Sequence, residues 1–502
     1  MDFASSSHLL TPQHISTLLG GAALTTILYA LGTAIYNLYF HPLRNYPGPK
    51  FYAASRLPYA LDLWRGQINR TVAAAHKQYG EVVRIAPDEL SFISGETAWQ
   101  DIYGFRGGKK AEFGKDLHWY SPSPNNVRSM LSTTRESHSR VRRIFSHAFS
   151  DKALRDQEPL IQRYIDLLVQ RLRERAEQGV DVDVVRYYNF TTFDVIADLT
   201  FGESFGCLES DDYHALVRGA FASIQALSFK LALRYYKPIE KAYYWWNKNK
   251  PMGNVIFFNF TAGKVERRLG METARPDVVT AVQNQPESKA ISTEELKSNS
   301  ALFLIAGSET TATMLSGTTY ALLKNPDVLK KLCEEVRGAF KSSDEITFER
   351  VNHLPYLLAV LNEGLRMYPP VPTGFPRKVP DGGETVSGHF VPDNTSVYVS
   401  QYATYHSELN FAEPDSFIPE RWLDNDPRFE NDKKSVLMPF SNGPRNCLGK
   451  NLAYAEMRCI LAKVIFHFDL ELIDQKKNWF DQRVFTLWEK GPLLIKIKEA
   501  RR

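Results

Sequence analysis

A loop centred on Cys447 holds the residues best suited to chemistry in this chain. It reads Phe440-Ser-Asn-Gly443-Pro-Arg445-Asn-Cys447-Leu-Gly449 and directly precedes an apolar segment of helical period. A helix N-terminus and free loop N–H groups stabilise a thiolate, so we expect the thiol pKa to be lowered. The glycines leave room for a flat ligand, and Arg445 can face an acidic group of that ligand. The setting makes Cys447 a candidate metal ligand or nucleophile, whereas a lone cysteine near glycine is usually a buried structural residue.

A second group of residues lies in the middle of a long predicted helix. Helical periodicity extends over residues 292–323, beginning at a capping box, which gives a length of about 45 Å. Its centre reads Ala306-Gly307-Ser-Glu309-Thr310-Thr, where glycine and adjacent threonines lower the helix propensity. Such a local break indicates a functional site, and the alternative is a contact of small residues between packed helices.

Charged residues form two further motifs. Glu363 and Arg366 lie three residues apart on a predicted helix that ends at two prolines, and Arg421 stands in Pro-Glu-Arg-Trp. Taken alone, Glu363 and Arg366 predict a surface ion pair of little energetic weight. Upstream, His138 and Arg142 lie on a basic amphipathic segment, which is ordinarily a solvated helix face.

Together these motifs resemble those of the cytochrome P-450 family. F-x-x-G-x-R-x-C-x-G resembles the haem-binding signature, and the centre of the long helix resembles the oxygen-groove motif A/G-G-x-D/E-T-T/S. E-x-x-R and P-E-R-x resemble the two halves of the family's buried Glu-Arg-Arg network. The family usually carries W-x-x-x-R on the upstream helix, and this chain has His138 in place of the tryptophan. The motifs follow one another in the family's order.

The resemblance implies a role for each of these residues. Cys447 is the axial thiolate ligand of haem iron. Haem-binding roles fall to Phe440, Gly443, Arg445, Gly449, Arg142, His138 and Arg377, the last at a place where the family often has a propionate-binding arginine. Ala306 and Gly307 are assigned to the space for dioxygen, and Glu309 and Thr310 to proton delivery. Glu363, Arg366 and Arg421 are assigned to a structural network.

The activity implied is that of a haem-thiolate monooxygenase with haem b as cofactor and O2 as co-substrate. No Gly-rich dinucleotide fingerprint follows a predicted strand, so electrons are expected from NADPH through a separate cytochrome P-450 reductase, with cytochrome b5 as a second candidate donor. The expected docking positions are Arg135, Arg143, Lys330, Lys331, Lys450 and Arg458. Two alternatives stay open: a haem-thiolate isomerase or dehydratase that does not use O2, and a non-catalytic haem-binding protein.

The substrate is expected to be a hydrophobic small molecule. Segments that resemble the family's substrate-facing regions are mostly apolar or aromatic, at residues 105–120, 221–233, 302–306, 371–375 and 486–493. Two sequence segments resemble those of fungal members that act in secondary metabolism on terpenoids, polyketides or alkaloids, namely HPLRNYPGPK and HSRVRRIFSHAFS. That assignment is one of analogy.

These residues must be positioned by a body that is expected to be mainly α with small β-sheets. The resemblance implies the cytochrome P-450 fold. Long charged helical periodicities dominate, and residues 378–400 alternate Val, Thr and Tyr between turn residues, which predicts a small antiparallel sheet. The predicted organisation is a short non-cytosolic N-terminus at 1–14, a transmembrane anchor at 15–40, a proline-rich hinge at 41–50 and a catalytic domain at 51–502.

The anchor follows from the absence of charge between Phe3 and Leu43, and from an apolar stretch long enough to cross about 30 Å of hydrocarbon. A buried helix or a cleaved signal peptide is the alternative. Lys and Arg follow the span and none precedes it, which predicts a single-pass protein of the endoplasmic reticulum with a cytosolic body.

Composition excludes several other classes of protein. The 502 residues are 43% hydrophobic and 24% charged, with a formal net charge of +4, which excludes disorder and a polytopic membrane protein and makes nucleic acid a poor candidate partner. The 4 cysteines are scattered and form no C-x-x-C pair, so a disulfide scaffold is not expected and a reducing compartment is.

Overall fold

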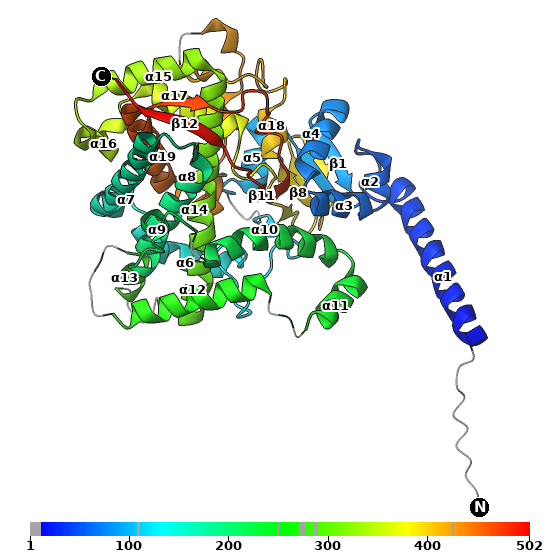
Figure 1. Ribbon diagram of the computed structural model, residues 1–502. Coiled ribbons are helices and arrows are strands. Elements are labelled where there is room, and N and C mark those ends of the chain that lie inside the picture. Colours follow the sequence, from blue (N-terminus) through cyan, green and yellow to red (C-terminus); the bar gives the residue numbers. More distant parts are fainter. Residues whose placement is uncertain are drawn as a thin grey trace, which may run out of the picture.

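The computed structural model describes residues 12–107, 111–213, 215–248, 250, 252–271, 275, 277–284, 290–423 and 426–501; the side chains of residues 15 and 215–224 lie outside this description. Helices surround the long central helix α14 (Thr293–Lys324), and α1 (Pro12–Tyr39) stands apart from the body (Figure 1). The prediction of a mainly α fold with small sheets is confirmed.

The helices have the following bounds. Before α14 these are α2 (Lys50–Ala54), α3 (Leu57–Arg65), α4 (Ile68–Tyr79), α5 (Gly95–Tyr103), α6 (Arg135–Ala148), α7 (Asp151–Gln178), α8 (Val184–Phe201), α9 (Cys207–Ser210), α10 (Ala215–Arg234), α11 (Lys237–Trp246), α12 (Gly253–Leu269) and α13 (Val278–Gln283). After α14 they are α15 (Pro326–Ala339), α16 (Phe348–Val351), α17 (Pro355–Met367), α18 (Gln401–Tyr405) and α19 (Lys450–His467).

The largest sheet has the strand order β1-β2-β8-β5-β3. Its strands are β1 (Val82–Ala86), β2 (Glu89–Phe92), β3 (Gly114–Lys115), β5 (Arg377–Lys378) and β8 (Ser396–Val399). A second sheet joins β4 (Val182–Asp183), β12 (Leu494–Glu499) and β9 (Phe468–Leu472), and two hairpins pair β6 (Glu384–Val386) with β7 (His389–Val391) and β10 (Val484–Phe485) with β11 (Leu487–Trp488).

The single antiparallel sheet expected over residues 378–400 is corrected by these pairings. β6 and β7 form an antiparallel hairpin, and β5 pairs antiparallel with β8, as expected. The other edge of β8 pairs parallel with β2, with Leu90 opposite Val397. Parallel pairing needs a long crossover. Here about 300 residues separate the two strands, so local alternation could not reveal the partner.

α14 crosses the whole body because its ends are well defined and its interior is buried almost all round. The Ser292 hydroxyl accepts a hydrogen bond from the Glu295 N–H, and the Glu295 carboxylate accepts one from the Ser292 N–H, which completes the predicted capping box. The helix packs against α8, α12, α17 and α19. Because it is buried on most sides, α14 is a core element and the axis on which the candidate site is built.

The proline-rich segment after α1 is held firmly against the body. The Arg84 N–H donates to the Pro47 carbonyl over 2.7 Å, and the Tyr46 hydroxyl donates to the Phe390 carbonyl over 2.7 Å. A Cβ on Gly48 would lie 2.2 Å from the Arg84 carbonyl oxygen, so only glycine permits this close approach. The segment therefore docks on β1, and the expected domain boundaries remain predictions; residues 1–11 lie outside the described residues.

α1 is long and apolar enough to cross a membrane. It has 28 residues, a mean hydropathy of 1.7 over its most apolar window, and no part of that window is buried inside the body. Its length and composition alone support the prediction of a membrane anchor.

Candidate functional site

The cysteine loop joins the body to the start of α19. The Cys447 N–H donates to the Phe440 carbonyl over 2.8 Å, and Phe440 packs its ring against Tyr454 of α19, with 5.1 Å between the ring centroids. Gly443 has a φ of 73°, and a Cβ there would lie 1.9 Å from the Tyr103 carbonyl oxygen. Gly443 is thus required by a backbone contact with α5, which corrects the expectation that it makes room for a ligand.

The sulfur of Cys447 lies deep among protein atoms, yet the residue presents accessible surface, so it faces space inside the protein. Burial raises the pKa of the thiol, and the Gly449 N–H, Arg142 and Lys450 oppose that rise without cancelling it. The lowered pKa expected from the helix N-terminus is therefore not found for the protein alone. A metal must displace the thiol proton to obtain a thiolate, as thiolate ligands require.

Gly449 differs from Gly443 in its surroundings. No atom lies within 4 Å of an added Cβ on Gly449, so open space adjoins this residue beside the sulfur. The expectation that a flat ligand can approach the backbone here stays a prediction, with Gly449 as the glycine whose geometry permits it.

The centre of α14 presents a second accessible surface inside the body. Ala306 is exposed and Thr310 half-buried, although α14 runs through the middle of the molecule (Figure 1). The Thr310 hydroxyl donates to the Ala306 carbonyl over 2.7 Å. A Cβ on Gly307 would instead lie 2.8 Å from the Ile196 side chain of α8. Gly307 is therefore required for helix packing, the alternative that the sequence left open, and its assignment to dioxygen space stays a prediction.

Glu309 forms a buried ion pair with Lys490. The Lys490 ammonium donates to the Glu309 carboxylate and, over 2.7 Å, to the Thr313 hydroxyl, and both charged side chains are 4% exposed. Burial raises the pKa of Glu309 and lowers that of Lys490, while each charge opposes the shift of the other. Burial thus shifts the two pKa values toward one another.

α6 connects the cysteine loop to α14. Arg142 donates to the Asn446 carbonyl over 2.6 Å and to the Asn446 side-chain oxygen over 2.5 Å, next to Cys447. One turn further, Phe145 packs edge-on against Phe303 of α14, with 4.8 Å between the ring centroids. The loop and the accessible part of α14 are therefore held in place by the same helix.

A group of cations surrounds a single carboxylate beside the cysteine loop. Arg445 donates to Glu112 over 2.5 Å and to the Thr133 carbonyl over 3.0 Å. Arg377 is 3% exposed, its nearest guanidinium nitrogen is 3.6 Å from Glu112, and its Nε has no hydrogen-bond partner among the described residues. Lys115 lies near both arginines, and burial first, then these neighbours, lowers its pKa far below the usual value.

His138 is buried in the same region and is neutral. Burial, then the charges of Arg445, Arg142 and other nearby cations, lowers the pKa of His138 to about 3. The structure thus brings together His138, Arg142, Arg377 and Arg445, which sequence motifs had marked separately. It adds Lys115, whose place in the short strand β3 carried no motif.

The buried charge network is formed as the motifs indicated. Arg366 donates two hydrogen bonds to Glu363, over 2.9 and 2.8 Å, and Arg421 donates one over 3.1 Å; all three side chains are fully buried. Burial would raise the pKa of Glu363, but the two arginines outweigh it and hold the pKa below its usual value. Asp432 and Trp422, which the sequence did not mark, complete the network by bonding Arg421 and Glu363.

Comparison with known proteins identifies the family. A family model described as "Cytochrome P450" matches residues 49–496. The chain belongs to the cytochrome P450 family. It is 48% identical to the cytochrome P450 monooxygenase lcsI of Purpureocillium lilacinum, across 99% of this chain and 98% of that protein. It is 44% identical to efuB of Hormonema carpetanum, across 96% of both chains, and 44% identical to FUM2 of Gibberella moniliformis, across 93% of this chain and 100% of that protein. Both carry the name cytochrome P450 monooxygenase.

The chain is accordingly an oxidoreductase of the monooxygenase class. A cytochrome P450 binds haem and uses O2 with electrons from a redox partner. The residues of this structure fit that cofactor. Four cations, Arg142, Arg377, Arg445 and Lys115, gather where Glu112 is the one carboxylate in contact with any of them among the described residues. Two propionates would bring the negative charge and the acceptors that this cluster lacks.

Proposed function

We propose that this P450 is a membrane-anchored haem b monooxygenase that oxidises a hydrophobic small molecule in fungal secondary metabolism, with electrons from NADPH through a separate reductase. The observation that carries the proposal is that Cys447 faces space inside the protein, beside a cluster of cations that contacts a single carboxylate among the described residues. The names of the fungal relatives support the reaction class. Terpenoids, polyketides and alkaloids remain the candidate substrate classes.

Cys447 would hold the iron of the haem, and Arg445, Arg377 and Arg142 would receive its propionates. His138, being neutral, would add a hydrogen bond without adding charge. Lys115 supports the same role from β3. When bound, the haem supplies the oxygen-activating chemistry, and the chain fixes its orientation.

Thr310 and the Glu309–Lys490 pair would manage protons. The Thr310 hydroxyl borders the accessible space and donates to the Ala306 carbonyl, from which a side-chain rotation can free it. Glu309, one residue earlier on α14, is buried with Lys490 and has an acid pKa raised by that burial. A buried acid–base pair next to the threonine provides a proton store shielded from bulk water.

Membrane attachment is supported by α1 and by a second apolar surface. Trp245 and Trp246 of α11 are 67% and 74% exposed, among lysines of the same segment. α11 lies toward the side of the body from which α1 leaves in Figure 1. Tryptophan and lysine are favoured at the membrane interface, so we propose that α11 rests on the endoplasmic reticulum membrane that α1 enters.

The reductase would dock on the basic face near α6 and the start of α19. Arg143 on α6 and Lys450 at the start of α19 are exposed, as is Lys330 on α15, whereas Arg458 is half-buried and donates to Asn352. Arg458 is therefore the weakest of the expected docking residues.

The test is the carbon monoxide difference spectrum of the reduced membrane protein, compared between wild type and Cys447→Ala at matched haem content. We expect the red-shifted band of a haem-thiolate in wild type and its loss in the variant. A haem-loaded wild type without that band would refute thiolate ligation. Oxygen-independent turnover of a substrate would instead favour an isomerase or dehydratase.

A further inference from the structure

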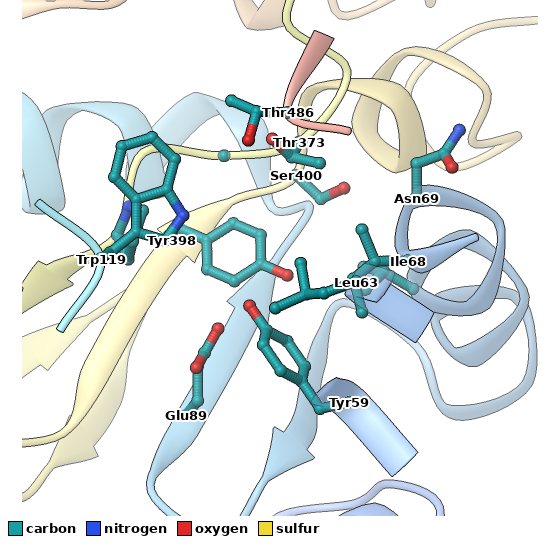
Figure 2. Close-up of a pocket in the computed structure, with 13 residues that line it drawn as sticks. Tyr59, Leu63, Ile68, Asn69, Glu89, Trp119, Thr373, Tyr398, Ser400 and Thr486 are labelled. Carbon is teal, nitrogen blue, oxygen red and sulfur yellow. The ribbon is translucent and has the colours of Figure 1, made fainter. Parts of the chain in front are cut away.

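Two carboxylates beside the largest sheet have opposite charge surroundings. On β2, Glu89 lines a small cavity next to Tyr59 (Figure 2). Arg56 pairs with Glu89 and also with Asp88, so one guanidinium contacts two carboxylates there. Shortly before β3 the ratio is reversed, because the carboxylate of Glu112 lies among several cations.

Glu112 contacts arginines from three distant segments. Its carboxylate accepts a hydrogen bond from Arg445 Nε of the cysteine loop over 2.5 Å, and nitrogen atoms of Arg377 on β5 and Arg135 on α6 lie 3.6 and 3.7 Å from it. The Arg135 side chain is largely exposed, so water screens that pair strongly. The side chains of Arg445 and Arg377 are nearly buried, and their contacts with Glu112 are therefore the less screened ones.

The fold anchors the backbone of Glu112. The next residue, Phe113, is buried in a core cluster that includes Trp99. Two residues further on, Lys115 of β3 pairs with Arg377 of β5 in antiparallel register. A buried ring and a strand pairing thus follow Glu112 directly, and little backbone freedom is left at this position.

Glu112 determines how the Arg445 side chain is oriented. The guanidinium donates through Nε to Glu112 over 2.5 Å and through Nη1 to the Thr133 carbonyl over 3.0 Å. Two hydrogen bonds from different nitrogen atoms fix both the plane and the rotation of a planar group. Without the carboxylate only the bond to a neutral carbonyl remains, and the long side chain regains rotamer freedom.

Glu112 also offsets the repulsion among the cations. Burial first, and then Arg377 and Arg445, lower the pKa of Lys115, whereas Glu112 raises it. In the part of the chain that the structure describes, Glu112 is the one carboxylate that contacts these two arginines. Removal of its charge would leave the cations to repel one another.

We propose that Glu112 is a positioning residue for the haem, because its carboxylate holds Arg445 and Arg377 in place to receive the two propionates. The inference rests on the proposed haem-thiolate function and adds to it a residue that no motif marked. Glu112 also keeps a negative charge near the propionates. Because reduction adds an electron to the haem, this charge disfavours the ferrous state and lowers the midpoint potential.

The experiment compares three variants of the haem-loaded full-length protein with wild type. Glu112→Leu removes the charge and the hydrogen-bond acceptor, whereas Glu112→Gln keeps an acceptor and removes the charge. Glu136→Gln neutralises an exposed carboxylate on α6 and is the control. Haem transfer to excess apomyoglobin should be about tenfold faster from Glu112→Leu than from wild type, since the charge-assisted hydrogen bond that orders Arg445 is lost.

A redox titration followed by absorbance supplies a readout of charge. Glu112→Gln keeps the shape of the side chain, so a purely structural role would leave the potential unchanged in this variant. We expect its ratio of ferrous to ferric haem at a fixed potential to rise about threefold, which is about 30 mV for a one-electron couple. Glu136→Gln should show the wild-type potential.

Two results would overturn the inference: haem release from Glu112→Leu at the wild-type rate, or a potential of Glu112→Gln equal to that of the control. If Glu112→Leu yields no folded protein by circular dichroism, the potential of Glu112→Gln decides alone. The proposed function fails separately, through the absence of the carbon monoxide band in wild type.

Discussion

Glu456 on α19 is a buried carboxyl whose ionisation the fold opposes. It is 3% exposed, and burial raises its pKa from 4.5 to about 8, with a hydrogen bond from Thr311 of α14 as the only opposing influence. At neutral pH the folded protein therefore holds a proton on Glu456, whereas the unfolded chain has lost it. Replacement by glutamine keeps the shape and the hydrogen bond to Thr311 and removes the titration.

The sign and size of the effect follow from linkage. Between pH 4.5 and about 8 the folded state binds more protons than the unfolded state, so the stability of wild type falls as pH rises through this window. Each pKa unit corresponds to about 1.4 kcal/mol, which gives a penalty of about 3 kcal/mol at neutral pH. Glu456→Gln should be free of this penalty.

The assay is the Tm of the haem-loaded protein at a fixed scan rate, measured from about pH 5.5 to about pH 8.5, because a protein of this size unfolds irreversibly. The advantage of Glu456→Gln over wild type should widen by about 3 °C across this range, given an unfolding entropy of about 2 cal/mol/K per residue. Glu334→Gln, an exposed carboxyl on α15, serves as the control and should show no such trend. A difference that stays constant with pH, or narrows as pH rises, would refute the reasoning.

Three further substitutions test the site. Lys490→Met leaves Glu309 buried without its cation and should lower the stability by about 3–5 kcal/mol, seen as a lower Tm. The double variant with Glu309→Gln should recover most of that loss. Equal Tm values in the single and double variants would contradict an energetic coupling between the two residues. Gly443→Ala should reduce the yield of folded protein, since its Cβ would lie 1.9 Å from a backbone carbonyl oxygen, whereas Gly449→Ala should fold; circular dichroism of both variants decides this. Glu363→Gln should lose haem during purification, because it breaks a fully buried charge network at a cost of about 3–5 kcal/mol; normal haem content would exclude that role.

The sequence predicted those structural features that depend on the local pattern of residues. The capping box at Ser292, the weakened centre of α14 and the loop before α19 all lie within short segments, where periodicity and turn residues carry the information. Partners far along the chain left no such trace. Lys490 contacts Glu309 across 181 residues.

Burial was the other quantity that the sequence could not supply. The helix N-terminus at Cys447 was expected to lower the thiol pKa, but desolvation dominates and raises it. Gly307 was assigned to dioxygen space, and its small size is also required by helix packing, because a Cβ there would meet the side chain of Ile196. In both cases packing against a distant element decided the outcome, and the local motif did not reveal it.

At Lys115 both its burial and its distant charged neighbours were hidden from the sequence, and this residue gives a last prediction. It stands near Arg377 and Arg445 in a buried region with Glu112 as the nearby carboxylate, so its own charge is disfavoured in the protein alone. Haem propionates would reverse this by adding negative charge. Replacing Lys115 with methionine should therefore leave folding intact while removing one charge-assisted hydrogen bond, worth about 1.5–3 kcal/mol, from the bound haem.

The measurement is haem transfer to excess apomyoglobin, followed by absorbance. Lys115→Met should release haem at least about tenfold faster than wild type, since about 1.4 kcal/mol corresponds to a factor of ten. Lys378→Met, which removes a cation from the adjacent strand position, is the control, because Lys378 pairs with Asp88 and Asp116 and not with Glu112. If both variants release haem at the wild-type rate, Lys115 does not face the propionates, and the excess charge of the cluster must be balanced by the three arginines alone.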